Sequence, residues 1–160
     1  AGGRIEGTNG PGVYLDSGVS LSSLTNAGSI TGSVGQPAVQ NYGGSLGNLS
    51  NSGTVGEVAN YGLLGQLTNT GTMGNLSNSG VIGTGVGTAI SSTGAGASIG
   101  ELYNAGTING AITVANQDLL IHGGTSPQFG AIENGTLTVQ NGSLVFVDGA
   151  TSPVPRRRRR

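Results

Sequence analysis

Apolar residues recur at fixed intervals in the middle of the chain, with glycine and asparagine at fixed positions between them. Regular nine-residue units fill residues 46–83, and the four copies start at Leu46, Val55, Leu64 and Met73. Each copy follows the pattern Φ-G-x-Φ-x-N-x-G-x, in which Φ is apolar. A short, strict period is typical of stacked identical units, so the pattern predicts a solenoid.

The asparagine of each unit is expected to point into the solenoid. Alternate residues of a strand share a face, so Leu49, Asn51 and Gly53 face the same way, and an inward Leu49 turns Asn51 inward. Stacked coils would align these amides about 4.8 Å apart, where they hydrogen-bond to one another and offset the cost of burying them. Looser copies of the unit occur at 24–30, 39–43 and 99–108. The predicted structural ladder therefore comprises Asn26, Asn41, Asn51, Asn60, Asn69, Asn78 and Asn104.

The odd length of the unit requires corners. A continuous strand would turn its inner face outward at every nine-residue repeat, so the phase must be reset between units. We expect the glycine pairs 53/56, 62/65 and 71/74 to form the corners, because glycine accepts positive φ without penalty. Two units then make an 18-residue coil, which places Asn51 on Asn69 and Asn60 on Asn78.

The rest of the chain extends this pattern. We predict an all-β fold in which residues 1–155 form a single parallel β-solenoid with about 18–25 residues per coil and Asn/Gly-rich turns. Residues 84–98 break the repeat and predict an irregular loop or a bulged coil, and 111–150 predict denser coils. Roughly seven or eight coils would give a rod of about 35–40 Å. No segment has a helical apolar period with caps, so almost no helix is expected.

Charged residues are scarce, and most of the basic ones lie in the C-terminal tail. Charged residues make up 8% of the sequence, there is no cysteine, and no apolar stretch is long enough for a signal peptide or a membrane span. Five of the six basic residues form the run 156–160, and without it the net charge is −6. The run follows an extended Pro153–Pro155 segment and differs from everything before it, which favours a purification tag over a native site for nucleic acid or anionic membrane. We expect no nucleic-acid partner.

The sequence offers little for catalysis or metal binding. Nine-residue calcium-binding rolls need an aspartate in each unit as an oxygen ligand, and residues 46–83 contain none. Asp118, His122 and Ser126 lie close in sequence and suggest a triad, but a strand–turn segment spreads such side chains and no nucleophile elbow is present. The seven acidic residues are scattered. We therefore expect no enzyme, no catalytic or metal-binding residue and no cofactor.

Two tyrosines stand out as candidate contact residues. Tyr42 and Tyr61 each follow a ladder asparagine, so both should point outward. They are 19 residues apart, which is one coil plus the inserted Gly44, and they should stack in neighbouring coils. An exposed tyrosine pair can contact a sugar ring or another solenoid. The alternative is an aromatic ladder that only stabilises the sheet.

The repeat texture resembles the passenger domains of bacterial autotransporters. The resemblance covers roughly residues 12–150 and is carried by repeats of the form L-T-N-x-G-x-I-x-G, by the segment 12–32 that contains one of them, and by the later run 106–114. It implies a right-handed parallel β-helix that is exported and displayed at the bacterial cell surface (outer membrane) or secreted. Passengers of that family act as adhesins, as autoaggregation factors or as stalks that carry an enzymatic domain.

Function and partners follow from the same resemblance. It implies an adhesive or autoaggregating stalk that contacts itself or a host surface glycan or protein. Membrane contact would come only through a C-terminal barrel outside this sequence. The alternative is the scaffold β-helix of an exported carbohydrate-active enzyme or esterase whose catalytic part lies outside this sequence. No functional residue is carried over from the family, because the shared repeat is structural.

Overall fold

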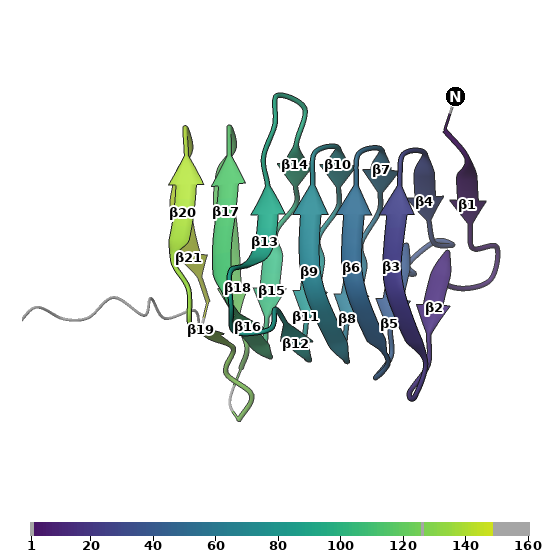
Figure 1. Cartoon of the computed structure of the whole chain (residues 1–160), viewed down its shortest axis with the longest axis horizontal. Helices are drawn as coiled ribbons and strands as arrows, with labels where there is room; N and C mark the ends of the chain where they lie inside the picture. The colour runs from purple at the N-terminus through teal and green to yellow at the C-terminus, as the bar shows by residue number, and fades with distance from the viewer. Residues whose placement is uncertain (1, 126, 149–160) are drawn as a thin grey trace, which may run out of the picture.

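The computed structural model describes residues 2–125 and 127–148, and these form 21 β-strands and no helix. All paired strands are parallel and belong to three sheets (Figure 1). The first sheet contains β1 (Arg4–Glu6), β4 (Ser29–Thr31), β7 (Thr54–Val55), β10 (Thr72–Met73) and β14 (Ser98–Ile99). The second contains β2 (Val13–Leu15), β5 (Val39–Asn41), β8 (Val58–Asn60), β11 (Leu76–Asn78), β15 (Leu102–Asn104), β18 (Leu119–Gly123) and β21 (Leu144–Val147).

The third sheet contains β3 (Ser20–Asn26), β6 (Ser45–Asn51), β9 (Leu63–Asn69), β12 (Val81–Ile82), β13 (Thr88–Ser92), β16 (Thr107–Asn109), β17 (Ala111–Ala115), β19 (Ala131–Glu133) and β20 (Leu137–Gln140). The chain passes through the three sheets in turn as far as β14 and then alternates between the second and third sheets; the fold is a right-handed parallel β-helix, as the sequence predicts. The second sheet has seven strands, and at about 4.8 Å per strand the stack is about 30 Å long.

The length of each coil can be read from bonds between stacked residues. Bonded partners are 18 residues apart at Asn51 and Asn69, 19 at Asn41 and Asn60, and 26 at Asn78 and Asn104. The 18-residue coil made of two nine-residue units is therefore confirmed in the regular segment. Longer coils carry extra residues in loops, such as the one between β13 and β14 that projects above its neighbours in Figure 1.

Successive nine-residue units adopt two different conformations. Six of the nine residues of the unit that starts at Leu46 lie in one strand, β6, whereas the unit that starts at Val55 is divided between β7, β8 and the first residue of β9. In β6, Leu46 and Leu49 are both buried although they are three residues apart, so the alternation of faces shifts within the strand. The prediction that Gly65 lies at a corner is therefore wrong, because Gly65 lies inside β9 and the shift takes place within that strand.

Corner glycines are required for close approach between coils. A Cβ atom on Gly53 would lie 2.2 Å from the carbonyl oxygen of Gly28, and one on Gly71 would lie 2.2 Å from that of Gly53. Neither residue has positive φ, so the prediction of positive φ at these corners is wrong. The backbones of successive coils pass too close at this corner for any side chain. Positive φ occurs in irregular turns, for example at Gly43 and Gly83.

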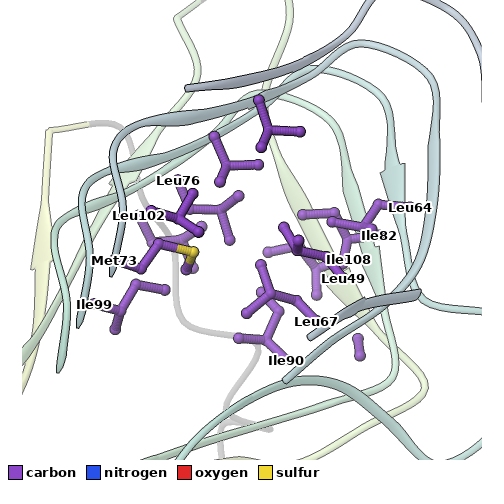
Figure 2. Packing of buried hydrophobic residues seen from close by; sticks show 14 of the residues in the cluster. Leu49, Leu64, Leu67, Met73, Leu76, Ile82, Ile90, Ile99, Leu102 and Ile108 are labelled. Atoms are coloured by element: carbon purple, nitrogen blue, oxygen red, sulfur yellow. The ribbon is translucent and has the colours of Figure 1, made fainter. Parts of the chain in front are cut away.

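Apolar side chains stacked from all three sheets fill the interior. Leu49 and Leu67 stack from the third sheet, Leu76 and Leu102 from the second, and Met73 from the first (Figure 2). Each is buried, and burial of such a side chain stabilises the fold by about 1.5–3 kcal/mol. This apolar core holds the outer face of each sheet in a fixed position.

Residues 84–98 form a coil of irregular path. They contain all of β13, whose register against β17 shifts between Thr88 and Ile90, and the first residue of β14. Ser92 takes the inward position that asparagine occupies in the preceding coils. The later segment 111–148 returns to stacked strands, β17 to β21.

Candidate functional surface on the second sheet

The inward asparagines form two ladders in the described residues. Asn26, Asn51 and Asn69 are joined by Nδ2-to-Oδ1 hydrogen bonds of 2.8 Å, and Asn69 then donates to Ser92 Oγ at 3.0 Å. The second ladder joins Asn41, Asn60, Asn78 and Asn104 by bonds of 2.8 Å each. All seven side chains are buried. Their role is structural, because no ligand can reach them.

Each ladder residue also stabilises a corner. Asn51 accepts a hydrogen bond from the backbone N–H of Gly53 at 3.1 Å and donates to the carbonyl oxygens of Gly53 and Thr72. The second ladder ends at Asn41, whose buried Oδ1 has no partner because Leu15 occupies the position above it. The amide column therefore extends only as far as the asparagine repeat.

Most of the chain's reactive side chains lie on one outer surface, that of the second sheet. Inward Val13 and Leu15 turn Tyr14 outward, and inward Leu102 and Asn104 do the same for Tyr103. The register then aligns Tyr103 with His122. This face and its two edges hold all four tyrosines, the single histidine and most of the carboxylates: Tyr14, Tyr42, Tyr61, Tyr103, His122, Asp16, Glu57, Glu101, Asp118 and Asp148.

Three of the tyrosines form a continuous strip, which we call the tyrosine strip (Tyr14, Tyr42 and Tyr61). The ring centroids of Tyr42 and Tyr61 are 5.9 Å apart with a tilt of 60°, and those of Tyr14 and Tyr42 are 6.2 Å apart at 22°. The exposed fractions are 51% for Tyr14, 55% for Tyr42 and 49% for Tyr61. Each of the three residues is therefore about half exposed to solvent.

Polar groups and a shallow hollow border the strip. Ser17 and Gly43 line the hollow together with Tyr42 and Tyr61. Asp16 is exposed at the same edge and accepts a hydrogen bond from the Ser17 N–H at 2.8 Å. The pKa of Tyr14 is raised, mainly by partial desolvation and to a smaller extent by the nearby Asp16 carboxylate and by Tyr42. The sequence interpretation missed Tyr14, although the V-Y-L alternation signals its outward direction.

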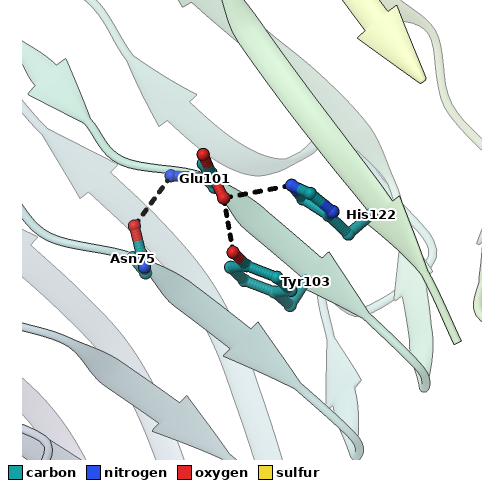
Figure 3. Close-up of polar contacts among 4 residues, drawn as sticks. All are labelled: Asn75, Glu101, Tyr103 and His122. Carbon is teal, nitrogen blue, oxygen red and sulfur yellow. Dashed lines mark hydrogen bonds and ion pairs between the residues drawn. The ribbon is translucent and has the colours of Figure 1, made fainter. Parts of the chain in front are cut away.

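A second cluster lies further along the same face (Figure 3). The Tyr103 hydroxyl donates to Glu101 Oε2, and His122 Nε2 lies 3.0 Å from the same oxygen. The rings of Tyr103 and His122 stack at 4.4 Å and 14°, and the Glu101 N–H donates to Asn75 Oδ1 at 3.0 Å. The hydrogen bond to Glu101 is the main cause that raises the pKa of Tyr103. The sequence interpretation missed this cluster, although the spacing of Tyr103 and His122 by one coil indicates that the two rings stack.

The structure does not assemble the triad suggested by the sequence. Asp118 Oδ1 accepts from the Ser143 N–H at 2.7 Å, and His122 pairs with Glu101 instead. Ser126 lies outside the described residues. His122 Nε2 is itself buried, so this nitrogen is not placed to exchange a proton with a substrate. No group of three or more His, Asp or Glu side chains in the described part of the chain is arranged to hold a metal ion.

The fold defines the class of protein: a parallel β-solenoid with two inner asparagine ladders and one aromatic outer face. No protein-family model matches the chain, and searches of curated proteins and of solved structures find no match. Within the described residues, no helix has the length and apolar character needed to cross a membrane.

Proposed function

We propose that this chain is a non-enzymatic adhesive stalk, displayed on a bacterial cell surface or secreted as an autotransporter passenger. Its contacts would be made by the outer face of the second sheet with a host surface glycan or protein, or with other copies of the chain. The observation that carries the proposal is the tyrosine strip, three adjacent rings that are each about half exposed. Contiguous exposed aromatic groups are typical of interaction surfaces.

The scaffold suits such a role for a physical reason. Tyr14 stands on β2, and Tyr42 and Tyr61 directly follow the ladder residues Asn41 and Asn60 at the ends of β5 and β8. The core and the asparagine ladders hold these positions, so little backbone freedom is left to lose on binding. Individual contacts through a tyrosine are weak, but a stack that presents several in a row, on many copies, adds them through multivalency.

The alternative function is the scaffold of an exported enzyme whose catalytic part lies outside this sequence. It makes a different prediction for the tyrosine strip, since a scaffold of that kind needs no contact there. The two proposals can therefore be distinguished by testing whether adhesion or self-association depends on these rings.

Sedimentation velocity and bead adhesion together test the proposal. Wild type and a Tyr42→Ala/Tyr61→Ala variant would be compared, with and without residues 156–160, for oligomers and for attachment of protein-coated beads to host cells. We expect the double variant to lose oligomerisation or attachment while circular dichroism shows the same β-content.

The matched control is Val34→Ala/Val86→Ala, which removes two exposed apolar side chains that lie away from the tyrosine strip. It should behave as wild type. A wild-type chain that neither self-associates nor attaches, or attachment that is equal in both double variants, would contradict the adhesive role.

A further inference from the structure

We propose that the tyrosine strip and the hollow beside it bind an extended, uncharged glycan chain built from pyranose rings with equatorial hydroxyl groups. This inference rests on the adhesive function proposed above and names the chemistry of its ligand. Such sugar rings have C–H groups on their faces and hydroxyl groups at their rims. They therefore need flat aromatic surface and, beside it, hydrogen-bond acceptors.

The geometry of the strip fits a chain better than a single sugar. Tyr42 and Tyr61 occupy equivalent positions in successive coils, and Tyr14 lies in the coil before them, displaced along its strand from the position opposite Tyr42. The centroid separations of 6.2 and 5.9 Å are similar to the length of one sugar residue. A glycan that lies along the axis can place successive rings over successive tyrosines. A closed cage would need walls on several sides, whereas this strip is open along its length.

The polar groups at the edge of the strip match the rim of a sugar. Ser17 lines the hollow next to Tyr42 and Tyr61, and the exposed Asp16 carboxylate lies at the same edge. A carboxylate can only accept hydrogen bonds, and the hydroxyl groups of a sugar can donate to it. The ligand therefore needs no charge to bind beside Asp16. The strip thus presents stacking surface and acceptors side by side.

The negative charge of the face disfavours anionic ligands and a second copy, relative to a neutral glycan. Asp16, Glu57 and Glu101 are negative, and the only arginine outside residues 156–160 is Arg4, which pairs with Glu6 at 2.7 Å on the first sheet. Two such faces brought together would repel each other, as would a sulfated or carboxylated glycan. A neutral glycan carries no such penalty.

Titration with cellohexaose, a neutral chain of β-1,4-linked glucose, tests the inference. We expect backbone amide NMR shifts to cluster at residues 14–17, 42–44 and 60–62, with affinity measured by calorimetry. Each single variant, Tyr14→Ala, Tyr42→Ala and Tyr61→Ala, should weaken binding about two- to tenfold. Tyr42→Phe should retain most of the affinity, because the ring remains, and Asp16→Asn should lower it.

Two controls identify the chemistry of the ligand. Val34→Ala/Val86→Ala should bind as wild type, and an oligogalacturonate of equal length should not bind, because it repeats the negative charge of the face. Choline probes the remaining alternative, a cation held over tyrosine rings beside a carboxylate. Tyrosine-dependent binding of choline that cellohexaose does not displace would overturn the glycan assignment.

The result can be separated from that of the adhesive function. If coated beads attach through the tyrosines but cellohexaose neither binds nor competes, the glycan inference fails while adhesion stands. If cellohexaose binds equally well to a Tyr14→Ala/Tyr42→Ala/Tyr61→Ala variant, the strip is not its site. If beads do not attach, chains do not associate and cellohexaose does not bind, both proposals fail.

Discussion

At the scale of single residues, the ladder asparagines combine two tasks. Asn51 bonds to Asn69 in the next coil and at the same time closes the corner at Gly53. An amide suits both tasks because it carries donors and acceptors without charge. The same short side chain therefore sets the stacking register and the shape of the corner.

Replacement of Asn69 by aspartate should destabilise the fold by about 3 kcal/mol or more at neutral pH. Asn69 is 0% exposed and donates to Ser92 Oγ and to the Ser98 carbonyl oxygen, and a carboxylate cannot donate to either. Chemical denaturation measures the change. The loss should shrink as the pH falls, because the introduced carboxyl group regains a donor when it is protonated.

Asn48→Asp is the matched control, since Asn48 lies exposed on the third sheet. Its free energy of unfolding should stay within about 0.5 kcal/mol of wild type. Equal stability of the Asn69→Asp variant and wild type would show that the ladder does not require an amide at this position.

Tyr103 should make the folded state sensitive to alkaline pH. Its pKa is raised in the folded protein, mainly by the hydrogen bond to Glu101, so the unfolded chain loses this proton first. The stabilisation is complete below the ordinary tyrosine pKa, about 10, and is lost as the pH rises through the higher folded value. In Tyr103→Phe the free energy of unfolding should therefore fall less steeply above pH 10.

Glu101→Gln checks the cause of this effect, because it removes the charge that holds the tyrosine proton. It should flatten the alkaline decline in the same direction as Tyr103→Phe. Part of the alkaline decline in the free energy of unfolding that remains comes from Tyr14, whose pKa is also raised. Identical alkaline slopes for wild type and Tyr103→Phe would rule out this contribution.

At the scale of elements, the corners are decided by contact between coils. The glycine of each N-x-G corner faces the carbonyl oxygen of the equivalent glycine one coil earlier: Gly71 faces Gly53, and Gly80 faces Gly62. The distances to an added Cβ, 2.2 and 2.1 Å, leave no room for a methyl group. These glycines therefore set how closely the first and third sheets, and the second and third, meet.

Gly71→Ala should cost about 2 kcal/mol or more, because the new Cβ would overlap a backbone carbonyl that cannot move without shifting a coil. Thermal unfolding followed by circular dichroism measures the loss. Gly96→Ala is the control: no atom lies within 4 Å of its added Cβ, and it should be neutral or slightly stabilising. Equal melting temperatures for both variants would contradict the close-contact explanation.

At the scale of the whole molecule, each coil contacts only its neighbours, and one core runs through all of them. Stability in such a stack is the sum of coil and interface contributions, so inner coils should be the last to open. Among the described strands, β8, β9 and β11 have a coil on both sides, whereas β1 has one neighbour, β4.

Hydrogen exchange measured by mass spectrometry should show this gradient, with slowest exchange in β8, β9 and β11 and faster exchange in β1 and β2. Leu67→Ala should lower protection in the central coils by about 2–5 kcal/mol, because Leu67 is fully buried in one of them. Ile5→Ala, at a half-exposed site in β1, should affect only the first coil. Uniform protection from β1 to β11 would show that the stack opens as one unit instead.

The sequence alone determined the features that repeat. The spacing of Leu49, Asn51 and Gly53 specifies which residues point inward, the 18-residue coil and the amide ladders, because stacking identical units brings identical side chains together. The outward direction of Tyr42 and Tyr61 follows from the same alternation. Each of these properties depends on local spacing and the strand period.

Only the tertiary structure decided the features that depend on closing the coil. Units of the same pattern are straight at Leu46 and bent at Val55, because three sheets must enclose one core and the local sequence does not distinguish the two places. The register between coils of unequal length decides which side chains meet on the second sheet. It brings Tyr14 to Tyr42, and Tyr103 to His122 and Glu101. Inserted residues such as Gly44 set those lengths, and which turns absorb them is a property of the packed stack.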